Sequence, residues 1–205
     1  GLAETSRMVL AVAKEEYEDF RYPLEVVDMS THTMVKDESD ADKVSGKLVG
    51  SLNKVPYLEV DGQIIPQSKT IERFLARKFN MMGSSVLEEA RIDAICECVR
   101  DFKEMYQKVR TAENKAEAET EWFTVILVER LTLLENLLGE DGFSVGSVTS
   151  LSDIVLYSFI SNFFDNTEAS MNATQTTPRL RSIVERVNTL PEMVKWLEVS
   201  PKTNF

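Results

Sequence analysis

The stretch that decides the fold is KVPYLEVDGQIIPQSKTIERFLARK, residues 54–78. Within it, VPYLEV and QIIP are β-prone runs on either side of Asp61-Gly62, a dipeptide that favours the mirror-image turns of β-hairpins. Pro56 has no backbone N–H, so we place it at the first residue or the edge of a strand. The apolar residues that follow recur at helical spacing and predict a helix over residues 68–79.

Both ends of this hairpin carry residues suited to binding a small peptide. If the Val55–Pro56 peptide bond is cis, the backbone of Val55 faces outward, and a short peptide can add to that edge as one more strand. Ser68 is predicted as the N-cap of its helix, where its hydroxyl and the free amides of the first turn can bind a carboxylate. Gln67 adds an amide that both donates and accepts. Each feature alone is more often structural, but together they predict a receptor for a peptide with a free carboxylate.

Composition limits the possible partners. The chain has 205 residues, of which 43% are apolar and 28% charged, and its net charge of −11 corresponds to a pI near 4.7. This acidity argues against nucleic acid or an anionic membrane as the main partner. The two cysteines cannot form a disulfide framework, which favours a reducing compartment, the cytoplasm. No apolar run approaches the length of a membrane span or a signal sequence.

The chain divides into two units of different character. Residues 1–80 are predicted as an α/β unit, and residues 87–205 as an all-helical domain, joined by the linker Gly83-Ser84-Ser85. In the first unit we expect a helix, an extended segment, and a polar exposed loop with a helix starting near Asp40, before the hairpin. These cover residues 2–15, 17–27 and 28–45. In the second unit the periodicity predicts helices over residues 87–110, 117–138 and 150–164, and two more that begin at Pro178 and Pro191.

The hairpin and its helix resemble a known family. KVPYLEVDG and QSKTIERFLARK are similar to the glutathione-binding half of cytosolic glutathione transferases, most of all the sigma-class type that includes haematopoietic prostaglandin D synthase. GLAETSRMVLAVA and ARIDAICECVRDFKEMY resemble the first helices of the two domains of that family. SVTSLSDIVLYSFI carries its S-x-x-D capping box, here Ser150 and Asp153, which we interpret as structural. The resemblance implies a thioredoxin-like N-terminal domain followed by a helical-bundle C-terminal domain.

The resemblance also implies a glutathione site in the first domain. Pro56 would be the cis-proline, and the backbone of Val55 would pair with the cysteinyl unit of glutathione. Gln67 and Ser68 would hold the γ-glutamyl carboxylate. Such a ligand is anionic at two ends and cationic at one, so cationic groups and a helix N-terminus suit it.

Three further residues belong to the implied site. Lys54 and Lys47 would approach the glycine carboxylate, and Asp101, in the segment that matches the family's DDF, would reach the γ-glutamyl amine of the neighbouring subunit in a homodimer. Met105 and Tyr106 are candidates to line the pocket for a hydrophobic electrophile between the domains.

The catalytic residue is unknown in this sequence. In the family, a tyrosine on the first strand stabilises the glutathione thiolate, and that strand is expected upstream of Gly1. Tyr17 and Tyr22 are interpreted as packing residues of the next strand. Arg100 stands where the prostaglandin synthase has one of three acidic metal ligands, so we expect no metal there, although Glu97 keeps its acidic character.

The remaining polar candidates point to structure. Cys96 and Cys98 lie about 200° apart around a helix, so they cannot share a metal and are predicted as core or interface thiols. His32, the only histidine, is interpreted as a surface residue of a polar loop. The apolar residues of 121–138 surround most of their helix, which indicates a core or dimer position.

Two functions remain open. The first is an enzyme, a sigma-like glutathione transferase that conjugates the glutathione thiolate to electrophilic small molecules. The second is a non-catalytic module of the same fold, such as the docking unit of translation elongation factor 1-gamma or a lens crystallin. A tyrosine-bearing strand upstream of Gly1 would favour the enzyme.

Overall fold

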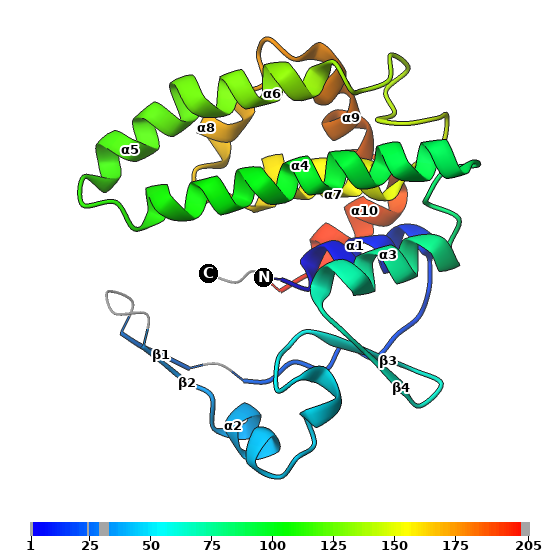
Figure 1. Cartoon of the computed structure of the whole chain (residues 1–205), viewed down its shortest axis with the longest axis vertical. Coiled ribbons are helices and arrows are strands. Elements are labelled where there is room, and N and C mark those ends of the chain that lie inside the picture. The colour runs from blue at the N-terminus through cyan, green and yellow to red at the C-terminus, as the bar shows by residue number, and fades with distance from the viewer. Residues whose placement is uncertain (1, 24, 29–32, 202–205) are drawn as a thin grey trace.

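The computed structural model describes residues 2–23, 25–28 and 33–201, and Figure 1 shows the arrangement of their elements. The described first part contains α1 (Glu4–Ala13), β1 (Glu25–Asp28), β2 (Thr33–Val35), α2 (Asp37–Val44), the 3₁₀ turn η1 (Val49–Ser51), β3 (Tyr57–Val60), β4 (Gln63–Pro66) and α3 (Ser68–Lys78). The second part contains α4 (Val86–Arg110), α5 (Lys115–Glu121), the π-helical segment η2 (Trp122–Ile126), α6 (Leu127–Glu135), α7 (Leu151–Asn162), α8 (Thr167–Asn172), α9 (Pro178–Asn188) and α10 (Pro191–Val199). The fold is a thioredoxin-like N-terminal part with a helical-bundle C-terminal part.

The predicted hairpin is confirmed. β3 and β4 pair antiparallel, with Tyr57 opposite Pro66 and Val60 opposite Gln63. Asp61 and Gly62 both adopt positive φ, at 51° and 72°, which is the backbone of a type I′ turn. Because this turn matches the right-handed twist of the strands, it fixes the register that the site depends on.

The first part holds its strands in two separate antiparallel pairs, β1–β2 and β3–β4, within the residues described. The extended segment predicted for residues 17–27 contains a strand only over β1, and residues 15–23 join no ladder. The predicted loop of residues 28–45 instead contains β2 and α2, which begins at Asp37 rather than near Asp40. A strand needs a neighbour for its backbone hydrogen bonds, and residues 15–23 take part in neither of the two described strand pairs. His32 lies outside the described residues.

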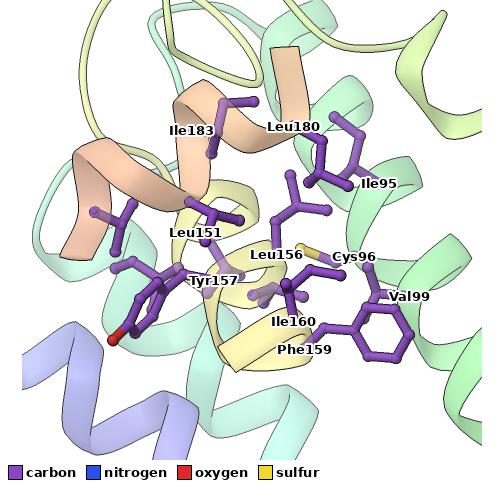
Figure 2. Packing of buried hydrophobic residues seen from close by; sticks show 14 of the residues in the cluster. Ile95, Cys96, Val99, Leu151, Leu156, Tyr157, Phe159, Ile160, Leu180 and Ile183 are labelled. Atoms are coloured by element: carbon purple, nitrogen blue, oxygen red, sulfur yellow. The ribbon is translucent and has the colours of Figure 1, made fainter. Parts of the chain in front are cut away.

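The core of the molecule surrounds α7. Every residue from 151 to 160 is buried, and Figure 2 shows α7 between α4 and α9, with Ile95, Cys96 and Val99 on one side and Leu180 and Ile183 on the other. A helix that is apolar around its circumference has to be covered on all sides. The elements that cover it come from both parts of the chain, since α1 and α3 also contact α7.

The start of α7 is held by a buried ionic network. Asp153 is fully buried; its Oδ2 accepts from the backbone N of Ser150 at 2.9 Å, and its Oδ1 accepts from the N of Ser144 at 2.7 Å. These contacts include the predicted capping box, which is confirmed. Arg186, from α9, donates to Asp153 at 3.0 Å, to the carbonyl of Gly142 at 2.6 Å and to Thr149 at 2.9 Å. The carboxylate therefore ties α7, α9 and their preceding loop together.

The helix predicted over residues 117–138 is interrupted. The chain passes from α5 through the wider π turns of η2 into α6, and it ends at Glu135. Trp122 and Phe123 of η2 are buried in a cluster of aromatic rings with Tyr106 and Phe164. Because π turns change which residues face inward, the helix turns these two rings toward the core. Pro178 and Pro191 occupy the first helical position of α9 and α10, as predicted.

Candidate functional site

The hairpin register brings the predicted binding residues to one place. Tyr57 faces Pro66 across the ladder, so Pro56 and Gln67 each lie one residue beyond its open end, with Val55 and Ser68 next to them. The Val55–Pro56 peptide bond is cis. Val55 is 48% exposed, Gln67 is exposed, and Ser68 is partly buried. Two backbone segments twelve residues apart in sequence thus meet at an accessible edge.

The start of α3 differs in one respect from the prediction. Ser68 is the first residue of the helix, and the N-cap is Gln67, with φ 71° and ψ 116°. No side chain accepts a hydrogen bond from the first turn, so Ser68 does not cap the helix. Non-glycine residues with positive φ are uncommon and often occur at ligand sites. The first-turn amides of α3 therefore stay available for an anion.

Lys47 is not poised for a carboxylate ligand in this structure. Its Nζ donates to Asp42 at 2.7 Å, and the hydroxyl of Tyr22 donates to the same oxygen at 2.7 Å. Burial, together with this hydrogen bond to Asp42, raises the pKa of Tyr22 to about 12, so its proton stays on the hydroxyl. Lys54 is exposed in the loop directly before Val55. Of the two lysines, Lys54 is thus the one next to the open end of the hairpin.

Asp101 is exposed on α4 and lies beside an ionic network at the α3–α4 boundary. Arg100 contacts Glu97 at 2.6 Å, Glu104 at 2.8 Å and Asp101 at 3.3 Å. The guanidinium of Arg100 thus places a positive charge at the position that Sequence analysis considered for a metal ion. In the described residues, no group of three or more histidine, cysteine or acidic side chains is arranged to hold a metal.

A second cluster of charges, which the sequence did not predict, lies near the start of α3. Glu72 is 2% exposed, and both of its oxygens accept from Lys69 Nζ, at 2.9 and 3.0 Å. Burial raises the pKa of Glu72 despite this ion pair. On α4, burial and the charge of Lys69 lower the pKa of Lys103 to about 8. The only available signal was helical spacing, which places Lys69 and Glu72 on one face of α3.

The remaining predicted candidates are occupied elsewhere. Tyr106 is 2% exposed, inside the aromatic cluster, so it does not line an open pocket, whereas Met105 is half-buried. Burial raises the pKa of both free thiols, Cys96 and Cys98, which disfavours their reactive thiolate forms. The hydroxyl of Tyr157 donates to Asn188. The site geometry therefore rests on the open end of the β3–β4 hairpin and on the first turn of α3.

None of the described helices combines the length and apolar character that a membrane crossing requires.

Comparison with known proteins places this geometry in a family. Residues 100–200 match the family model described as glutathione S-transferase, C-terminal domain. The haematopoietic prostaglandin D synthase of Gallus gallus is 31% identical over 209 residues, covering 99% of this chain and 93% of that protein. A probable glutathione S-transferase 8 of Caenorhabditis elegans is 25% identical over 213 residues, covering 100% and 94%.

A solved structure agrees with these relatives. Monomeric Na-GST-3, a glutathione S-transferase from the hookworm Necator americanus, has a TM-score of 0.79 and 27% identity, and the match covers 100% of this chain and 95% of that one. The predicted resemblance to the sigma-like type is thereby confirmed. The chain belongs to the glutathione S-transferase family.

Proposed function

We propose that this protein binds glutathione at the open end of the β3–β4 hairpin and conjugates its thiolate to electrophilic small molecules. The observation that carries the proposal is the meeting of Val55–Pro56 with Gln67–Ser68 at one accessible edge. The two relatives described above are named as a prostaglandin D synthase and a probable glutathione S-transferase, and these names support conjugation over the alternative of a non-catalytic module.

Each group at this edge suits one part of glutathione. The exposed backbone of Val55 pairs with the cysteinyl unit as an added strand. The uncapped first turn of α3, with Ser68 and Gln67, receives the γ-glutamyl carboxylate, because amides and a helix dipole both favour an anion there. Lys54 approaches the glycine carboxylate. Lys47 can join it only by giving up its contact with Asp42.

In this proposal the two parts of the chain have different roles in binding the two substrates. Residues 1–80 form the glutathione-binding domain, and residues 87–205 supply the wall against which the electrophile binds. In the reaction the glutathione thiol loses its proton to solvent, and the sulfur forms a bond to the electrophilic carbon, which releases a leaving group where the acceptor carries one. A free thiol titrates at about pH 8.5, so the bound thiolate needs a hydrogen-bond donor. The family resemblance assigns that role to a tyrosine on the first strand of the fold.

A second copy completes the site in this proposal. Asp101, whose side chain is 62% exposed, extends toward the γ-glutamyl amine of the partner in a homodimer. Leu133 and Leu137 of the α6 region, 62% and 45% exposed, are apolar side chains that such an interface would cover. The two free thiols are consistent with the cytoplasm as the location.

The proposal is tested by glutathione binding to the full chain and to Ser68→Ala. A hydrogen bond to a charged group contributes about 1.5–3 kcal/mol, so we expect the variant to bind roughly 10- to 100-fold more weakly in isothermal titration calorimetry. Thr70→Ala, an exposed hydroxyl two residues further along α3, serves as the matched control and should bind like the parent. Equal affinity of Ser68→Ala and the parent would show that the carboxylate binds elsewhere.

A further inference from the structure

Lys103 faces the first turn of α3 from the opposite domain. α3 and α4 run antiparallel, because Arg77 contacts Glu89 and Arg73 contacts Asp93 and Glu97. Because the two helices run in these opposite directions, the first turn of α3 lies opposite residues 100–103 of α4. The charges of Lys69 and Glu72 both act on Lys103, as this arrangement requires. Figure 1 shows α3 and α4 running in opposite directions.

The positive charge of Lys103 has no carboxylate partner among the described residues. Glu72 is the carboxylate whose charge acts on Lys103, but both of its oxygens accept hydrogen bonds from Lys69. No ion pair within 4.0 Å joins Lys103 to an acidic side chain in the described part of the chain. Because burial lowers the pKa of Lys103 to about 8, the amine is mostly protonated at pH 7. A positive charge without a carboxylate partner therefore remains next to the first turn of α3, where we propose that glutathione binds.

Two aromatic rings frame this ammonium group. Its Nζ lies 5.0 Å from the centre of the Phe163 ring and 5.9 Å from that of Phe159, within the range of cation–π attraction. Arg110, two turns along α4, stacks on the same Phe163 ring at 5.3 Å. Figure 2 shows Phe159 on the side of α7 that faces α4. Phe159 has no exposed surface, whereas Phe163 and Lys103 are only partly buried. The surface open to a ligand is therefore the Phe163 ring with the Lys103 ammonium at its edge.

We propose that Lys103, framed by Phe159 and Phe163, binds an anionic group of the electrophile, so that the protein selects aromatic acceptors that carry a carboxylate. This inference rests on the proposed function, because the acceptor must lie next to bound glutathione. The partly buried ring of Phe163 contacts the aromatic body of the acceptor, and the ammonium pairs with its carboxylate. The ring of Phe159 is fully buried and contacts the ammonium only from within the core. Desolvated charge pairs of this kind discriminate strongly between a ligand with the charged group and one without it.

The test compares two glutathione conjugates that differ by one carboxylate, S-benzylglutathione and S-(4-carboxybenzyl)glutathione. Both lack a free thiol, so their binding does not report on thiol titration. Their dissociation constants are measured by calorimetry with the full chain, with Lys103→Met, and with Lys108→Met as a control that removes an exposed lysine of the same helix. We expect Lys103→Met to weaken the carboxybenzyl conjugate about 10-fold or more, and to change the binding of S-benzylglutathione and glutathione less than about 2-fold.

The dependence on pH gives an independent readout. The titratable groups that act on Lys103 are Lys69 and Glu72 of α3 and Cys96 of α4. Arg110 of α4 stacks on the same Phe163 ring, and the ring of Phe159 from α7 and that of Phe163, the residue after α7, complete the surroundings. As pH rises from 7 to 9, Lys103 loses its proton, so the parent should lose its preference for the carboxybenzyl conjugate. The preference of Lys103→Met should stay flat over this range. An unchanged preference in the parent across this range would contradict the assignment.

The outcomes separate this inference from the function on which it rests. If neither glutathione nor either conjugate binds the parent, the proposed function fails, and the inference fails with it. If all three bind but Lys103→Met weakens the two conjugates equally, the acceptor assignment alone is overturned. If Lys103→Met weakens glutathione itself, Lys103 pairs with a carboxylate of glutathione and not with the acceptor, which also overturns it.

Discussion

Two buried charge clusters in this protein are built in opposite ways. At the start of α7, Asp153 and Arg186 satisfy each other and the neighbouring backbone, and the carboxylate has no exposed surface. At the start of α3, Glu72 pairs with Lys69, while Lys103 has two phenyl rings and no carboxylate among the described residues. In the first cluster the positive and negative charges pair within the chain. In the second cluster the positive charge of Lys103 is not paired with any carboxylate of the described residues. This difference indicates that the first stabilises the fold and the second is suited to a ligand.

The largest expected effect comes from breaking the complete cluster. In Asp153→Ala, Arg186 loses its buried partner and two backbone N–H groups lose their acceptor. Removing one member of a buried ion pair costs about 3–5 kcal/mol, so we expect the free energy of unfolding in urea to fall by about that amount. Asp141→Ala, which removes an exposed acid from the preceding loop, should change it by less than about 0.5 kcal/mol. A similar stability for both variants would refute the structural role of Asp153.

The incomplete cluster should respond in the opposite direction. Lys103→Met removes a partly buried charge and keeps an apolar side chain of similar length, so we expect about 1–3 kcal/mol of added stability at pH 7. The pKa of Lys103 is lower in the folded state, so the unfolded chain binds more protons between about pH 8 and its ordinary value of 10.5. The parent should therefore gain stability as pH rises through this window, and lose it as pH falls through about 8.

Urea unfolding at pH 7 and pH 10 checks this prediction. The difference between Lys103→Met and the parent should shrink at the higher pH, and Lys108→Met should show no such change. Destabilisation by Lys103→Met at pH 7 would mean that the lysine has a stabilising partner, which would remove the contrast between the two clusters.

A smaller effect is expected from Glu72→Gln. Burial raises the pKa of Glu72 in the folded state, so the folded protein binds more protons than the unfolded one around that pKa. Stability then rises as pH falls toward the unfolded pKa and declines as pH rises through the folded one. Glutamine cannot titrate, so the free energy of unfolding of the parent should increase relative to that of Glu72→Gln as pH is lowered from 7 to 4. Parallel stability profiles over this range, measured by urea unfolding, would show that Glu72 is not destabilised by its burial.

The sequence was most informative where local rules act alone. The Asp61-Gly62 turn, the prolines that begin α9 and α10, and the capping box at Ser150 all follow from the conformational limits of a few adjacent residues. The hairpin was predicted for the same reason, and its register then placed the candidate glutathione residues together.

Prediction was weaker where distant residues decide the outcome. Ser68 was taken as an N-cap from its residue type, but the backbone of Gln67 takes that position. The rings of the π segment η2 pack on Tyr106 of α4 and on Phe164, which follows α7. Neither Arg186 nor Lys103 has a sequence pattern that reveals its partners. Strand pairing in the first part also depends on neighbours, which is why the predicted extended segment of residues 17–27 contains a strand only over β1.

The central claim is that the edge formed by residues 55–56 and 67–68 binds glutathione. The most direct test is to titrate the isotope-labelled full chain with glutathione and follow its backbone amide resonances by NMR. We expect the largest shifts at Val55, Ser68 and Lys69, with saturation at one equivalent, and much smaller shifts around α7 and α9. Saturating shifts confined to another surface, or no shifts at these three amides, would contradict the account.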